Sequence, residues 1–167
     1  MFKVNDVIVY GLQGVCQIVD VEEKIISGEK KEYFVLKTIN DKEATLYVPV
    51  DNEYVLKKMR YLLTKDEIDS LIDTMPDINP VWIANDNERK EHYRKVIECG
   101  DHLEMIKIIK AVNDHKKECK AKHKRLHMTD IRFSNDAERL LCSEFQYVLK
   151  LDSREELKEY IVSRIEK

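Results

Sequence analysis

Residues 7–26, VIVYGLQGVCQIVDVEEKII, place two apolar runs on either side of a short turn that begins at Gly11 and ends at Gly14. Glycine at both ends of the turn favours a tight reversal of the chain. The flanking runs alternate or are short, which is typical of β-strands. This stretch therefore predicts an antiparallel pair of strands near the start of the chain.

The same pattern continues to about residue 52. Turn residues at 27–29 and 40–41 separate the runs 33–39 and 44–48, and Pro49 stops the last run. Every glycine except Gly100 lies in this part of the chain. Short strands linked by turns are typical of small barrels. We expect a β domain over residues 1–55, a closed or nearly closed barrel of four or five strands.

After Val55 the apolar residues follow the helical period. Thr64 and Glu67 form the sequence pattern of a capping box, which predicts a helix through Met75 that Pro76 ends. Two further helices are expected over about 87–99 and from 102 to about 124.

The boundaries of the later helices follow from single residues. Gly100 is a typical left-handed stop residue, and Asp101 is a typical N-cap for the helix that follows. Ser134 or Asp136 is expected to precede a helix to Lys150, and Asp152 or Ser153 a last helix to Arg164. The fold class is therefore α+β, with an all-helical domain over residues 61–167.

The composition bounds the class of protein. The chain has 167 residues, of which 43% are hydrophobic and 37% charged, and this balance is typical of soluble globular proteins. We expect no membrane span, no signal peptide and a cytoplasmic location. The four cysteines form no Cys-x-x-Cys pair, so neither a disulfide framework nor a conventional zinc site is expected.

Positive charge is concentrated between Met105 and Met128. This segment holds eight lysines and arginines against two acids, whereas the whole chain has a formal net charge of -3. A local excess of this kind indicates a polyanionic partner, and nucleic acid is the first candidate. The first 55 residues carry 6 bases and 10 acids, so the two domains are expected to have different partners.

The sequence contains no glycine-rich phosphate loop, nucleophile elbow or recognisable Cys/His dyad, so we expect no enzymatic activity and no cofactor.

A stripe of possible metal ligands recurs every four residues: His115, Cys119, His123 and His127. A neighbouring pair of these could bind a transition metal, but on a helix all four cannot surround one ion. The alternative, which we favour, is a polar stripe beside the basic segment without a functional metal.

Trp82 is the only tryptophan and lies where a loop meets a helix. Two interpretations stay open: a core or interdomain anchor, and an apolar wedge for a nucleic-acid groove. The helix that follows interleaves Arg89, Lys90, Arg94 and Lys95 with glutamates, a pattern typical of a solvated face. Their closeness to Trp82 favours phosphate contacts as well.

Several stretches together resemble the CarD/CdnL family of bacterial transcription regulators. In the β domain the resemblance rests on residues 2–10, the Gly14-Val15 turn, residues 28–37 and 47–49. It continues from Tyr93 to Asp101 and through the basic segment, so it covers nearly the whole chain. The same N-terminal module occurs inside transcription-repair coupling factors, but these carry a long helicase that this sequence lacks.

The resemblance implies a Tudor-like β domain that binds the RNA polymerase β subunit by strand addition. The family's polymerase-contacting positions fall on Lys24 and on Tyr47, where the family commonly has arginine, so a salt bridge from Tyr47 is not expected. We assign polymerase binding to Lys24, Tyr47, Val48 and Pro49.

The resemblance also implies a helical domain that contacts promoter duplex DNA at the upstream edge of the bubble. A family tryptophan enters the minor groove just before an Arg/Tyr pair, whereas Trp82 lies further from Arg89 and Tyr93. The expected DNA-binding residues are Trp82, Arg89, Lys90, Arg94, Lys95, Lys116, Lys117, Lys120, Lys122, Lys124 and Arg125.

Taken together, the sequence predicts a monomeric, non-enzymatic transcription regulator that binds polymerase and DNA and stabilises the open promoter complex. One alternative is a protein-interaction adaptor whose basic helix binds an acidic protein surface. Another is a single-strand or RNA binder, which the low aromatic content of 8% disfavours.

Overall fold

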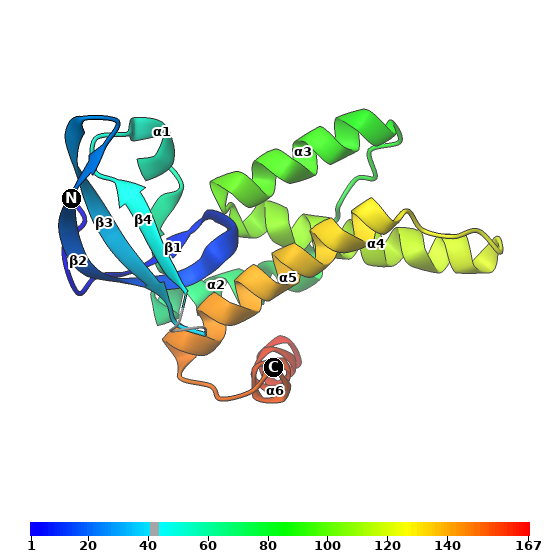
Figure 1. Ribbon diagram of the computed structural model, residues 1–167. Helices are drawn as coiled ribbons and strands as arrows, with labels where there is room; N and C mark the ends of the chain where they lie inside the picture. Colours follow the sequence, from blue (N-terminus) through cyan, green and yellow to red (C-terminus); the bar gives the residue numbers. More distant parts are fainter. Residues whose placement is uncertain (41–43) are drawn as a thin grey trace. The chain divides into compact units, whose positions relative to one another are not determined.

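The computed structural model describes residues 1–40 and 44–167, and these form two compact units, Met1–Leu62 and Leu63–Lys167 (Figure 1). The turn expected at Asn40 and Asp41 lies partly outside the described residues. All strands found in the described residues lie in the first unit, and the second unit is helical. The α+β fold class is therefore confirmed.

The first unit is an antiparallel sheet of five strands in the order β4-β3-β2-β1-β5. The strands are β1 (Val7–Tyr10), β2 (Gly14–Ile26), β3 (Glu29–Thr38), β4 (Thr45–Pro49) and β5 (Met59–Tyr61), with a short helix α1 (Glu53–Leu56) before β5 and a 3-10 turn η1 (Gly11–Gln13) after β1. Among the described residues no ladder joins β4 to β5, so the expected closure into a barrel is not found.

The hairpin of β2 and β3 is the longest feature of this sheet. Ser27 and Gly28 both have positive φ, at 54° and 81°, as the two-residue turn between Ile26 and Glu29 requires. The ladder between β3 and β4 covers only residues 33–37, whereas β2 and β3 stay paired from Ile26 and Glu29 onward. The far part of the hairpin therefore extends past β4 as a two-stranded ribbon.

One face of the sheet carries the hydrophobic core of the first unit. The alternation of apolar side chains along β2 and β3 places every second residue on this face. The core residues are Ile8, Cys16, Ile18, Phe34, Leu36, Val48 and Met59.

The second unit consists of α2 (Lys65–Thr74), a 3-10 turn η2 (Met75–Asp77), α3 (Asp86–Cys99), α4 (His102–Ala121), α5 (Met128–Leu149) and α6 (Arg154–Ile165). Thr64 and Glu67 form the expected capping box. Gly100 is left-handed at φ 70°, Asp101 caps α4 and Ser153 caps α6. These local predictions are confirmed.

Two helix boundaries differ from the prediction. Helix α4 ends at Ala121 and not near Lys124, and α5 begins at Met128, one turn or more before the expected caps Ser134 and Asp136. For the start of α5 the physical reason is Asp130, which lies in the first turn of α5, is completely buried and accepts hydrogen bonds from Arg89 of α3. This tertiary contact holds the first turn of α5 in place.

The core of the second unit collects apolar faces from all its long helices. Leu157 of α6, Phe145 of α5 and Met105 of α4 are among its most deeply buried members. Of the helices in residues 1–40 and 44–167, none is long and apolar enough to cross a membrane.

Candidate functional site

The outer edge of the sheet carries most of the residues assigned to polymerase binding. Tyr47, Val48 and Pro49 lie on β4, the edge strand. The Tyr47 side chain is 44% exposed, whereas the Val48 side chain points into the core. The Tyr47 side chain is therefore available to a partner, whereas the Val48 side chain is not.

Lys24 lies on β2 and reaches Tyr47 on the same face of the sheet. Its ammonium nitrogen is 3.2 Å from the centre of the Tyr47 ring, a cation–π contact. The charge at position 24 and the aromatic ring at position 47 therefore form one surface element. The structure brings these two sequence-predicted residues together.

The ribbon beyond β4 adds exposed apolar side chains to this region. Ile25 is 75% exposed and Ile26 50% exposed. Charged residues surround them. One ion pair, Lys30 with Glu23, joins the two strands of the ribbon, and a second, Lys31 with Glu29, lies within β3. The ribbon is thus a mixed apolar and charged surface.

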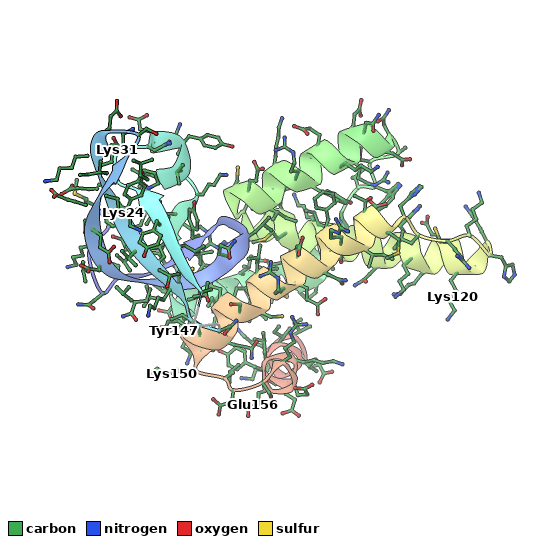
Figure 2. All side chains as sticks on the ribbon, in the orientation of Figure 1. Lys24, Lys31, Lys120, Tyr147, Lys150 and Glu156 are labelled. Carbon is green, nitrogen blue, oxygen red and sulfur yellow. The ribbon has the colours of Figure 1, made fainter. Side chains whose placement is uncertain are left out.

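The basic segment divides into two groups in the structure. Lys107 pairs with Glu104 at 2.7 Å, and the Lys110 ammonium donates to the carbonyl oxygens of Met75 and Ile78. The other cations are exposed, and none of them forms an ion pair with a described residue. We call this second group the basic tip: Lys116, Lys117 and Lys120 on α4, and Lys122, Lys124 and Arg125 in the connection to α5. Figure 2 shows Lys120 near the free end of α4.

The four-residue stripe of histidines and cysteine is not one helical face. Helix α4 ends before His123, which has a positive φ of 54°, and His127 stands at the N-cap position of α5 without a capping side-chain hydrogen bond. Cys119 is buried. Among residues 1–40 and 44–167, no group of three or more His, Cys, Asp or Glu side chains could hold a metal ion.

Arg89 is almost completely buried, with 1% of its surface exposed. Its guanidinium makes two hydrogen bonds of 2.8 Å to the carboxylate of Asp130, one to Asp86 and one to the carbonyl oxygen of Ile83. The hydrogen bonds to Asp130, followed by that to Asp86, raise its pKa above the ordinary arginine value. The sequence predicted a phosphate contact here, but the structure leaves this guanidinium no exposed face. The sequence pattern around Arg89 did not reveal this, because the partner Asp130 lies 41 residues further along the chain.

The other cations of α3 are exposed. Arg94 pairs with Glu91 at 2.7 Å and with Glu98 at 2.9 Å, as the interleaved pattern predicted. Lys95 lies 3.8 Å from Glu91, and Lys90 is also exposed. Surface pairs of this kind are weak, so these cations can exchange a carboxylate for a phosphate.

Trp82 is partly buried and packs against the core of the second unit. Its ring stacks on the His115 ring, with centres 3.8 Å apart and planes 11° from parallel. The Arg89 guanidinium carbon lies 4.4 Å from the centre of the Trp82 ring. Trp82 thus joins the loop before α3 to both α3 and α4.

Sequence reasoning missed two residues of this region. Asp130 forms a buried ion pair with Arg89. The one sequence signal for Asp130 was that it is an acidic residue near the start of a helix, and it lies in the first turn of α5. Val81, directly before Trp82, is 86% exposed. An apolar residue between Pro80 and Trp82 gave no periodic signal, because the loop has no regular structure.

A family model described as the CarD-like/TRCF RID domain matches residues 2–60. The match covers the strands of the first unit, including β5 up to Arg60. A domain of this kind interacts with RNA polymerase and points to a non-catalytic transcription regulator, although it also occurs in transcription-repair coupling factors, which are enzymes. Residues 2–60 therefore form a CarD-like RNA polymerase-interacting domain, consistent with the CarD/CdnL family.

Proposed function

We propose that this protein binds the β subunit of RNA polymerase through its first unit, contacts promoter duplex DNA through its second, and stabilises the open promoter complex. The observation that carries the proposal is the pairing of a polymerase-interacting domain with the exposed, unpaired basic tip on a separate unit. Such a regulator works in the cytoplasm, and a monomer suffices for both contacts.

On the polymerase side, we infer strand addition along β4. An edge strand presents unpaired backbone groups, which another chain can extend into the sheet. The Lys24 and Tyr47 contact lies beside this edge and offers a cation and an aromatic ring together. Pro49 ends the strand and offers its ring rather than a backbone donor.

On the DNA side, the basic tip supplies the phosphate contacts. Its six cations and the single acid Glu118 give the stretch 116–125 a net charge of +5. Each phosphate that a lysine or arginine neutralises releases counterions, which gives affinity without sequence choice. Lys90, Arg94 and Lys95 on α3 are further exposed cations of the same unit. Promoter selectivity then comes from DNA deformability and not from base readout.

The mechanism follows from linkage between binding and the state of the promoter. A protein that binds polymerase and the distorted upstream fork binds the open complex better than the closed one. Its binding free energy therefore shifts the equilibrium toward the open complex, to the extent that the two affinities differ. No chemical step by the protein is needed.

The lifetime of open complexes, measured with full-length protein and polymerase after addition of competitor DNA, tests the proposal. Wild-type protein should lengthen the lifetime. Lys24→Glu should abolish the effect together with co-purification of polymerase. The triple replacement of Lys116, Lys117 and Lys120 by alanine should abolish the effect while polymerase still co-purifies.

Lys158→Ala on α6 is the matched control, because Lys158 is an exposed lysine outside the basic tip. It should behave as wild type. If the triple replacement keeps its full effect on lifetime, the DNA contact is wrong. If the triple replacement keeps its affinity for duplex DNA but loses affinity for an acidic protein, the adaptor alternative is favoured.

A further inference from the structure

A cavity of about 480 Å³ lies in the second unit and is bounded by α4, α5, α6 and η2. Large apolar side chains form most of its wall: Ile106, Ile109, Leu141, Phe145, Leu157 and Ile161. Pockets that bind small molecules have volumes of roughly 300 to 1,000 Å³ and are lined mostly by hydrophobic side chains, with a few polar groups that fix the orientation of the ligand. The cavity therefore has the size and the lining of a small-molecule site.

Charged residues from three helices also line this cavity. The Arg154 guanidinium of α6 lies 3.9 Å from the Glu138 carboxylate of α5, so these two charges offset one another. Glu155 and Lys158 of α6 carry opposite charges, and both are exposed. The charge that remains without a counterpart is that of Lys110 on α4.

The Lys110 ammonium is held in place but is not neutralised. It donates hydrogen bonds to the carbonyl oxygens of Met75 and Ile78, and it forms no ion pair with any residue in 1–40 or 44–167. Its side chain is only partly exposed. An ammonium group has three N–H donors, so one donor remains for a ligand. A partly buried cation without a carboxylate favours an anionic partner, and its fixed position lowers the entropic cost of binding one.

We propose that this cavity binds a small molecule with an apolar body and an anionic head, of the class of the long-chain carboxylates, with the head on Lys110. The apolar body lies against the aliphatic and aromatic wall. The carboxylate accepts the remaining N–H of Lys110 in a charge-assisted hydrogen bond. The site does not depend on the proposed contacts with polymerase or DNA.

An amphipathic helix of a partner protein fits the same cavity less well. Stable protein interfaces bury roughly 800 Å² on each partner. Here the apolar wall is bordered by charged side chains on α4, α5 and α6, so the apolar surface is confined to the cavity itself. A small molecule is therefore the occupant that the lining favours.

Binding of 11-(dansylamino)undecanoic acid to the full-length protein tests the proposal, because the fluorescence of this probe rises in an apolar environment. We expect saturable binding that dodecanoate reverses. Lys110→Met keeps the apolar stem and should weaken binding of the probe about tenfold or more, since a hydrogen bond to a charged group is lost. Lys107→Met is the matched control and should bind as wild type, because Lys107 lies one turn away on α4, pairs with Glu104 and lines a different cavity.

The amide of the same probe separates a contact with the head from a change in the cavity wall. It should bind wild type more weakly than the acid does, and it should bind wild type and Lys110→Met equally well. A second readout is chemical. Cys142 lines the cavity and is partly buried, so bound probe should slow its alkylation by N-ethylmaleimide several-fold, while exposed Cys99 reacts at an unchanged rate.

The proposal is overturned if the probe does not bind saturably, or if Lys110→Met and Lys107→Met bind it equally. It is also overturned if Lys110→Met weakens binding of the acid and the amide alike, because Lys110 then only supports the wall. Bound probe that leaves the alkylation of Cys142 unchanged would lie elsewhere on the protein. Protection of Cys142 by an amphipathic helical peptide but not by the probe would identify a helix groove instead.

Discussion

Replacing Asp130 with asparagine should destabilise the second unit strongly. The Asp130 carboxylate is completely buried and accepts two hydrogen bonds of 2.8 Å from Arg89. Because arginine is not deprotonated in proteins, the guanidinium stays charged in the variant. Breaking a buried ion pair by removing one partner costs about 3 to 5 kcal/mol. Asp86 and the Ile83 carbonyl still satisfy part of the guanidinium, so we expect a loss near the lower value, ~3 kcal/mol.

For a domain of this size, a loss of ~3 kcal/mol corresponds to a fall in melting temperature of roughly 12 to 24 °C. Thermal melts of full-length protein followed by fluorescence report on this region directly, because Trp82 is the only tryptophan and lies 4.4 Å from the Arg89 guanidinium carbon. Asp86→Asn is the matched control. The Asp86 side chain is 53% exposed, so its loss should lower the melting temperature far less.

The reasoning would be refuted by an Asp130→Asn variant that melts within a few degrees of wild type. Equal shifts for Asp130→Asn and Asp86→Asn would also contradict it, because the difference in burial would then have no consequence.

Three further predictions concern charge, burial and reactivity. Replacing both Lys117 and Lys120 with alanine should weaken the salt dependence of binding to duplex DNA. The slope of log affinity against log salt should become less steep by about 0.9 for each phosphate that the variant no longer neutralises. Binding titrations at several salt concentrations measure this slope. Tyr93→Phe should leave the protein as stable as wild type or stabilise it by up to ~1 kcal/mol in a urea melt, because the buried Tyr93 hydroxyl has no hydrogen-bond partner among the described residues. Alkylation at pH 8, followed by mass spectrometry, should modify exposed Cys99 first and leave Cys16 intact, since burial raises the pKa of Cys16 to about 11 and keeps it a thiol.

The boundaries that the sequence predicted well depend on neighbouring residues. The capping box of Thr64 and Glu67 closes within four residues, and Gly100 with Asp101 ends one helix and begins the next. Such signals involve only backbone groups of adjacent turns, so no knowledge of the tertiary structure is needed. Ser153 as the cap of α6 belongs to the same class.

The features that the sequence did not predict depend on distant residues. Strand β5 pairs with β1 across about fifty residues, and it lies where the apolar spacing had already become helical. Arg89 looked like a surface cation because its neighbours are charged, but Asp130 draws it inside. The same ion pair moves the start of α5 ahead of its expected caps. For the candidate site, the charge pattern predicted a basic segment, but it did not predict that Trp82 contacts both His115 and Arg89.

Pro49 sets a limit on the size of any strand that joins the sheet. Edge strand β4 runs from Thr45 to Pro49, and at about 3.3 Å per residue it spans roughly 17 Å. Proline has no backbone N–H, so a joining strand finds no donor at that position. A partner segment therefore matches this edge over a handful of residues only. In the proposed complex, strand addition therefore supplies only a short ladder, and the Lys24 and Tyr47 side chains beside the edge add to it.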